Sequence, residues 1–309
     1  MNKIFNKENK AFVLSGSCAI ITILKSKLKK GAKVVIPNNV CTRVLESVVL
    51  SGMIPIIVGP KNGLVLQNED IEIIKKNTKF DAIIIVHNYG IESDVKKIRL
   101  NNLNTIIIED CAQYWSNDNN IGLFSNYVMT SVDSNKPLNG NHYGIILFDK
   151  EEVFLDKGIK TRYDNSLSLP FALTNEPTDK ELNNIIEMAS KNNFKINKYI
   201  KKLNHLLSNY RDIIYPNKKC NNLKYPIIFK STIHYNKFKK IADKQRFSYS
   251  EPHEKMLEEL PMLKNIKYYF YECGEKYMRN QIYIKVNNLS DKYIKILDNI
   301  LGEVFYDNN

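Results

Sequence analysis

Short runs of β-branched residues alternate with amphipathic stretches through the first half of the chain. Four of the runs lack polar alternation, which is typical of strands buried on both faces of a sheet, and they occupy 33–36, 54–58, 81–86 and 105–108. Between them lie stretches of helical length with one apolar face, at 17–29, 40–51, 69–76 and 94–101. This alternation predicts a mostly parallel sheet with helices on both faces.

The pattern changes after residue 149. A polar, turn-like stretch at 164–177 precedes one or two long helices at 179–210, two strands at 225–230 and 281–286, and a terminal helix at 290–301 with Ser290 as its N-cap. We therefore predict an α/β fold in three parts. These are a large α/β domain (1–178), a helical connector (179–215) and a small C-terminal α+β domain (216–309).

Composition fits a globular protein, because 43% of the 309 residues are hydrophobic and 25% are charged. The net charge of +12 raises the question of nucleic-acid binding. However, only six of the 45 basic residues are arginines, and the lysines are spread along the chain. Since phosphate-fork and base-reading sites favour arginine, the charge indicates a lysine-rich solvated surface, and we predict no nucleic-acid partner.

The five cysteines are odd in number and form no C-x-x-C pair. This excludes a disulfide framework and a zinc ribbon, and we predict no metal site. The N-terminus lacks the apolar core of a signal peptide, and no run approaches the roughly 20 apolar residues of a membrane span. We therefore expect a cytoplasmic protein without a membrane partner.

Ligands of open parallel sheets bind beyond the carboxyl ends of the strands, so the candidate chemistry lies at strand ends and at the starts of the following helices. Gly16, Ser17 and Cys18 lead into the first predicted helix, where free N–H groups suit a phosphate; a plain serine N-cap is the alternative. Asp110 ends the fourth strand. A carboxylate is costly to bury unless it meets a cation or donor, such as a protonated heterocyclic nitrogen; a helix N-cap is again the alternative.

Two further places follow predicted strands. Lys136 comes after a polar loop, and a lysine with a depressed pKa can form a Schiff base, although a chain so rich in lysine offers many chance placements. His87 and Tyr89 follow the third strand. They are candidates for substrate binding, and a hydrogen-bonded structural histidine is the alternative there.

The order of these places follows a family pattern. The stretches GSCAIITIL, GAKVVIPNN, SGMIPIIVG, AIIIVHNYG, IIIEDCAQ, TSVDSNK and YGIILF occur in that order, and KYMRNQIYIKVNNLSDKYIKILDNIL lies near the C-terminus. Together they resemble the DegT-type sugar-nucleotide aminotransferases, which are pyridoxal phosphate (PLP) enzymes of fold type I. The resemblance implies a cytoplasmic homodimer that transfers an amino group, with glutamate as donor, to a keto-sugar nucleotide for amino-sugar or surface-glycan synthesis.

The resemblance also implies roles for individual residues. Lys136 matches the lysine that binds PLP covalently and then moves the substrate proton, and Asp110 matches the carboxylate that pairs with the pyridine nitrogen. Gln113 matches the residue beside the 3′-oxygen of the cofactor. Ser131, Ser17 and Cys18 match the phosphate-binding positions.

The chain also departs from the family pattern. Cys41 stands where an aromatic ring usually stacks on PLP, and the segment 162–167 barely matches the one that reaches the partner subunit's site. These losses concern substrate binding more than cofactor binding. Two alternatives therefore stay open: a PLP enzyme of another type, such as a dehydratase or an enzyme of a non-nucleotide keto substrate, and a non-catalytic partner of a family aminotransferase.

Overall fold

A computed structural model describes residues 5–116, 120–149, 175–216, 224–251, 256–274 and 279–306. Its large sheet has the strand order β1-β7-β6-β5-β4-β2-β3-β10. The bounds are β1 (Asn9–Val13), β2 (Lys33–Pro37), β3 (Ile54–Gly59), β4 (Ala82–Val86), β5 (Ile106–Asp110), β6 (Tyr127–Val132), β7 (Tyr143–Phe148) and β10 (Tyr269–Glu272). The strands from β6 to β10 in this order run parallel, and β7 pairs antiparallel with both β6 and β1. The predicted α/β fold with a mostly parallel sheet is confirmed.

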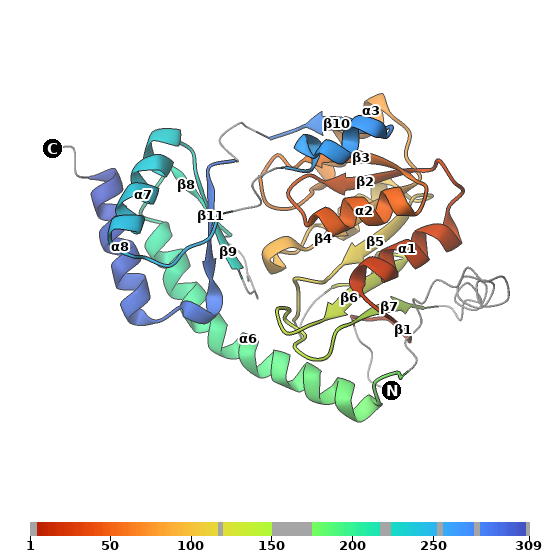
Figure 1. The fold of residues 1–309 in the computed structure, drawn as a ribbon, viewed down its shortest axis with the longest axis horizontal. Coiled ribbons are helices and arrows are strands. Elements are labelled where there is room, and N and C mark those ends of the chain that lie inside the picture. The colour runs from red at the N-terminus through yellow and green to blue at the C-terminus, as the bar shows by residue number, and fades with distance from the viewer. Residues whose placement is uncertain are drawn as a thin grey trace.

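Helices cover both faces of the large sheet (Figure 1). They are α1 (Gly16–Lys27), α2 (Thr42–Leu50), α3 (Asn68–Asn77) and α4 (Val95–Asn101). Successive residues of a strand point to opposite faces, and β2 shows this: Val34 and Ile36 pack in the cluster that contains α1 and α2, whereas Val35 packs in the cluster that contains α3 and α4. The same alternation determines which side chains at the strand ends share a face of the sheet.

The long helix α6 (Asp179–Leu207) joins the two parts of the molecule, as the sequence predicts. Its first half packs Leu182 and Ala189 against β6 and β7, and its second half packs Leu203 and Leu207 in the core of the small domain. Figure 1 shows it running beneath both. Thr178 caps its start, because the threonine side chain accepts a hydrogen bond from the Glu181 N–H.

The small domain has a three-stranded antiparallel sheet in the order β11-β9-β8. Its elements are β8 (Ile213–Ile214), β9 (Lys224–Phe229), β11 (Gln281–Lys285), α7 (Thr232–Lys244) and α8 (Asp291–Phe305). Ser290 caps α8 by accepting from the Tyr293 N–H, as predicted. No helix among the described residues is long and apolar enough to cross a bilayer.

One segment of the predicted small domain returns to the large sheet. Strand β10 pairs in parallel with β3, and Leu257 and Leu263 pack in the core beneath α1 and α2. The predicted boundary 216–309 does not anticipate this return. The physical reason is that β3 would otherwise be an open edge strand, and an edge is stabilised by whatever segment can pair with it; the hydrophobic pattern of β10 does not say which sheet it joins.

Candidate active site

The first helix begins with backbone donors directed at the carboxyl edge of the sheet. Ser15 is the N-cap of α1, because its Oγ accepts from the Cys18 N–H at 3.2 Å. Within the described residues, the N–H groups of Gly16 and Ser17 have no hydrogen-bond acceptor. Of the N–H groups in the predicted phosphate-binding turn, those of Gly16 and Ser17 are free to bind a ligand, whereas the Cys18 N–H already donates to Ser15. Burial raises the pKa of the Cys18 thiol.

A glycine in β7 lets this turn lie directly on the sheet. A Cβ at Gly144 would stand 2.2 Å from the Ser15 carbonyl oxygen and 2.9 Å from the Gly16 nitrogen. Any larger residue would push the start of α1 away from its place beside β7. The position of the free donors thus depends on a residue far along the chain.

Ser131, near the end of β6, lies against the same turn. A Cβ built on Gly16 would be 3.2 Å from Ser131 Cβ and 3.7 Å from its Oγ. The Ser131 side chain is buried, and its hydroxyl makes no hydrogen bond with the residues that the structure describes. A hydroxyl without a hydrogen-bond partner beside two free N–H groups forms a cradle that suits an oxyanion.

Adjacent carboxylates at the end of β5 face opposite sides of the sheet. Ile108 packs on the side of α1 and α2, so Asp110, two residues on, shares that face with Ser131. The Asp110 Oδ1 accepts from the Ala112 N–H at 2.9 Å. Burial raises the pKa of Asp110, against the opposing effects of this hydrogen bond and of the charge on Lys136. A positive partner at this place would stabilise the charged carboxylate.

Lys136 occupies the tight loop after β6, close enough to Asp110 for their charges to interact. Asp133 organises this loop: its carbonyl accepts from the Lys136 N–H at 3.0 Å, and its Oδ1 accepts from the Asn135 N–H at 2.9 Å. The other carboxylate oxygen lies 2.7 Å from Nδ1 of His142. These bonds lower the pKa of Asp133, the Asn135 N–H contributing most. The sequence analysis did not identify Asp133 as a residue that positions the lysine.

Gln113 belongs to a network of amides along the same edge. Its Nε2 donates to Oδ1 of Asn88 at 3.1 Å, and its Oε1 accepts from the Tyr89 N–H at 3.3 Å. Asn88 in turn donates to the carbonyl of Asn39 at 3.0 Å, and Asn39 donates to the carbonyls of Gly63 and Leu64. The network fixes Gln113 beside the end of β5. Asn88 lies inside the HNYG stretch, which the sequence analysis flagged for its histidine and tyrosine only.

His87 is fully buried and turned toward Glu109, on the other face from Asp110. The Ser93 N–H donates to its Nδ1 at 3.3 Å, so the ring proton lies on Nε2, which donates to Glu109 at 2.9 Å. The second carboxylate oxygen of Glu109 accepts from the Gly122 N–H at 2.8 Å. Both ring nitrogens are therefore in use. These contacts match the structural alternative of the sequence analysis rather than the predicted substrate contact.

Tyr89 connects the large sheet to the small domain. It is buried in the short 3-10 turn η1 (Asn88–Gly90), with a positive φ of 56°. Its hydroxyl lies 2.6 Å from that of Tyr283 on β11. Burial raises the pKa of Tyr89 to about 12, so the hydroxyl keeps its proton at neutral pH. In this arrangement Tyr89 fixes the two sheets to one another, and the predicted substrate contact would have to be made by another part of its side chain.

Cys41 is exposed at the N-cap of α2. It and Lys136 both lie within electrostatic range of Lys224, the first residue of β9. A lysine of the small domain thus lies close enough to interact electrostatically with the position where the resemblance implies an aromatic ring. Lys224 is one of many lysines, and no feature of the sequence distinguishes it. The predicted substrate segment 162–167 lies outside the described residues.

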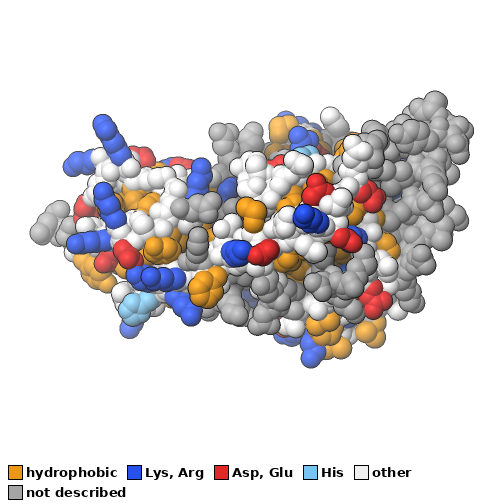
Figure 2. All heavy atoms as spheres, turned by 90° about the horizontal axis from the view of Figure 1, so that it is seen from below, with side chains coloured by type: hydrophobic (Ala, Val, Ile, Leu, Met, Phe, Trp, Pro, Cys, Tyr) orange, Lys and Arg blue, Asp and Glu red, His pale blue; other side chains and the backbone are white. Residues whose placement is uncertain are grey.

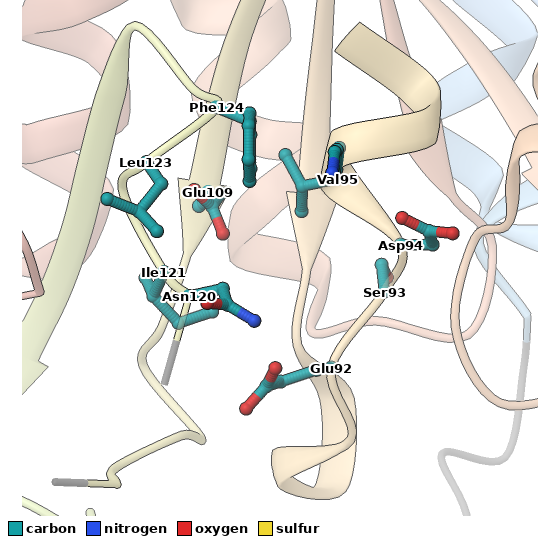
Figure 3. A pocket seen from close by; sticks show the side chains of 10 residues that line it. Glu92, Ser93, Asp94, Val95, Glu109, Asn120, Ile121, Leu123 and Phe124 are labelled. Atoms are coloured by element: carbon teal, nitrogen blue, oxygen red, sulfur yellow. The ribbon is translucent and has the colours of Figure 1, made fainter. Parts of the chain in front are cut away.

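A separate cavity of about 540 Å³ lies on the opposite face from Asp110, between the start of α4 and the loop 120–124. Figure 3 shows Glu109 and Glu92 at its wall, with Phe124 beside them. Glu109 already binds His87 and Gly122, and the Tyr114 hydroxyl donates to Glu92. This cavity is remote from the strand-end cradle and contributes nothing to it. Among the described residues, no three side chains gather as metal ligands.

The cradle has the groups that PLP requires. The N–H groups of Gly16 and Ser17 with the Ser131 hydroxyl suit the phosphate, and buried Asp110 suits a protonated ring nitrogen. Lys136 lies near that carboxylate on the same sheet edge. The phosphate, the ring nitrogen and the aldehyde of one cofactor are thus matched by residues that come from three separate segments of the chain.

Comparisons with known proteins agree with this geometry. The model of the DegT/DnrJ/EryC1/StrS aminotransferase family matches residues 3–161. None of the curated protein sequences compared with the chain matches it. Solved structures of low sequence identity share the fold. A DegT/DnrJ/EryC1/StrS aminotransferase from Brucella abortus is 16% identical, with a TM-score of 0.77 over 96% of this chain and 86% of that one.

Two other structures show the range of chemistry on this fold. PseC of Helicobacter pylori, an aminotransferase of pseudaminic acid biosynthesis, is 13% identical, with a TM-score of 0.75 over 97% of this chain and 88% of that one. A GDP-4-keto-6-deoxymannose-3-dehydratase from Escherichia coli is 15% identical, with a TM-score of 0.75 over 96% and 88% of the two chains. The family match spans more than half of the chain and includes the start of α1, Asp110, Ser131 and Lys136. The chain belongs to the DegT/DnrJ/EryC1/StrS aminotransferase family.

Proposed function

We propose that the protein is a PLP-dependent aminotransferase that acts on a keto-sugar nucleotide, with glutamate as the amino donor, in amino-sugar or surface-glycan synthesis. One observation carries the proposal: Asp110, Ser131, Lys136 and the free N–H groups of α1 lie at one edge of the sheet. The two strand residues among them, Asp110 and Ser131, also point to the same face. Family membership supports PLP chemistry in general. The identity of the keto substrate rests on the family resemblance alone.

Each residue has a distinct task in this proposal. PLP would supply an electron sink for the carbon that loses its proton. With its negative charge, Asp110 would hold a proton on the pyridine nitrogen, and Gln113 would lie beside the 3′-oxygen. The Gly16 and Ser17 N–H groups and the Ser131 hydroxyl would bind the phosphate. Lys136 would hold the cofactor and would act as the base that takes the proton from the substrate carbon.

The loaded protein gives the first test. We expect a visible absorbance band when PLP is added, and borohydride should fix the cofactor on Lys136, which peptide mass spectrometry identifies. Lys136→Ala should lose both signals, whereas Lys240→Ala on α7, an exposed lysine, should keep them. A protein that stays colourless with excess PLP would contradict the proposal.

Amino donors and reaction products together separate the reaction types. Glutamate added alone should convert the bound cofactor to its pyridoxamine form, which absorbs at shorter wavelength, and a full PLP band that no amino donor changes would contradict amino transfer. A dehydratase of this fold is also solved with glutamate joined to PLP, so mass spectrometry of the sugar product, which gains an amino group only in amino transfer, distinguishes the two reactions. If this protein has no activity of its own and co-purifies with a second, complete family member, the non-catalytic alternative would be favoured.

We also propose a homodimer, since the family resemblance implies a site completed by a partner subunit. Light scattering coupled to gel filtration should give twice the monomer mass of 35.9 kDa. A monomer that turns over glutamate would contradict this part of the proposal.

A further inference from the structure

Two lysines stand directly opposite each other at the end of the small sheet that is near Lys136. Strands β9 and β11 are antiparallel, and their register pairs Lys224 with Lys285. Residues paired in this way point to the same face with their Cβ atoms roughly 5 Å apart. The register thus makes the two side chains neighbours on one face of the sheet, and the charges of Lys224 and Lys285 interact.

The pair lacks a counter-charge. Like charges placed directly opposite on neighbouring strands destabilise a sheet. Among the described residues, no carboxylate lies within salt-bridge distance of either ammonium group, whereas Lys239 and Lys202 do pair with carboxylates, those of Glu251 and Asp291. Both lysines are exposed to solvent, and an anion bound between them would relieve their mutual repulsion.

The lysine pair lies close to the candidate active site. Lys224 interacts electrostatically with Lys136 and with Cys41 at the N-cap of α2. Its Nζ lies 5.5 Å from the centre of the Tyr283 ring, which a hydroxyl contact joins to Tyr89 on the large sheet. The tyrosine contact therefore joins β11, the strand that pairs with the Lys224 end of β9, to the large sheet.

We propose that Lys224 and Lys285 bind the diphosphate of a nucleoside-diphosphate substrate and so position its sugar near Lys136. This inference rests on the proposed function and assigns residues to its substrate side. Two ammonium groups match the two charges of the diphosphate, and lysine binds phosphate as a point charge without needing a planar fork. The lysine pair gives this chain a substrate-binding element on the small domain.

Binding of nucleoside diphosphates tests the assignment without any turnover. Calorimetric titration of the PLP-loaded protein with UDP, GDP and dTDP should find at least one that binds. Lys224→Ala/Lys285→Ala should weaken that binding by about tenfold or more per lysine, as expected for hydrogen bonds to a charged group. It should also flatten the dependence of affinity on salt. Lys240→Ala/Lys244→Ala on α7 removes the same charge from exposed positions and should leave the affinity unchanged.

Three results would overturn the assignment. One is equal affinity in the lysine-pair variant and its control. Another is that none of the three diphosphates binds. The third is a variant that binds the diphosphate normally but converts the cofactor more slowly with glutamate, since the pair would then bind the donor carboxylate instead. A protein that binds a diphosphate yet takes up no PLP would contradict the proposed function while leaving the lysine pair in place.

Discussion

Glu109 and Asp110 are neighbours in the sequence, and the structure predicts opposite consequences for their replacement. Glu109 is fully buried and accepts hydrogen bonds from the His87 ring and from the Gly122 N–H. In Glu109→Ala both donors lose their acceptor. An unsatisfied buried donor costs about 1–3 kcal/mol, so the free energy of unfolding should fall by about 2–6 kcal/mol. Glu109→Gln keeps one acceptor oxygen and should cost about 1–3 kcal/mol.

Asp110→Asn should leave the unfolding free energy of the apo protein at neutral pH no lower than that of the wild type. The amide oxygen can still accept from the Ala112 N–H, and the substitution removes a charge whose burial opposes ionisation. Because burial raises the pKa of Asp110 in the folded state, the folded protein holds this proton more tightly than the unfolded chain. The wild-type apo protein therefore loses stability as pH rises from the ordinary range of an aspartate through the raised pKa. Asp110→Asn should lack that loss.

Urea unfolding followed by fluorescence measures all three variants, because the single tryptophan, Trp115, is buried against Phe5. Adding PLP should stabilise the wild type and Glu109→Gln, and should stabilise Asp110→Asn much less, since the ring nitrogen then lacks its carboxylate. Two results would refute the reasoning. One is a Glu109→Ala protein within about 1 kcal/mol of the wild type, below the cost of a single orphaned donor. The other is an apo Asp110→Asn protein that is less stable than Glu109→Ala.

Three further changes probe the site. Gly144→Ala should cost about 1–3 kcal/mol of stability by overpacking and weaken PLP binding, because the new methyl group meets the Ser15 carbonyl and moves the start of α1. The control, Gly302→Ala, lies in a helix with open space around it and should instead stabilise the protein by about 0.5–1 kcal/mol. Thermal unfolding with and without PLP compares the two variants. Tyr89→Phe and Tyr283→Phe should each lower the unfolding free energy by about 1 kcal/mol, and a double-mutant cycle should give a coupling of about 0.5–1.5 kcal/mol across the hydroxyl pair; additive losses would contradict the contact. Ser131→Ala should weaken PLP binding about tenfold while leaving apo stability within about 0.5 kcal/mol, which a fluorescence titration with PLP measures; an unchanged affinity would exclude the hydroxyl from the cradle.

The sequence predicted the large sheet well because its signals are local. A buried strand followed by an amphipathic helix leaves a pattern in a dozen consecutive residues, and each of the four predicted strands and helices of the first half is present. Alternation within a strand also foretells faces, so Asp110 and Ser131 were predictable as residues of one sheet edge. A local pattern does not predict which distant segments pair. Strand β10 pairs with β3 across more than 200 residues, and the sequence of neither strand indicates its partner.

His87 shows the same limit at the scale of one side chain. Its position after a strand is equally compatible with a ligand contact and with a buried structural role, because the sequence does not reveal where the ring points. The two hydrogen bonds to Ser93 and Glu109 decide the orientation, and both arise from folding of the loop after β4 and from the register of β4 with β5. Asp133, which holds the loop of Lys136, was missed for the same reason.

The division between predictable and unpredictable residues follows the two halves of the proposed reaction. Residues for the cofactor come from the starts of helices and the ends of strands in the first half of the chain, where each strand or helix leaves a local pattern in the sequence. The residues that we propose for the substrate, Lys224 and Lys285, are brought together only by the register of two antiparallel strands. Because the small sheet is fixed to the large one through Tyr89 and Tyr283, substitutions on β9 and β11 can alter what the cleft binds without disturbing Asp110 or Lys136. On this reasoning a family member can keep the residues for the cofactor, as this chain keeps Asp110 and Lys136, and still change its substrate.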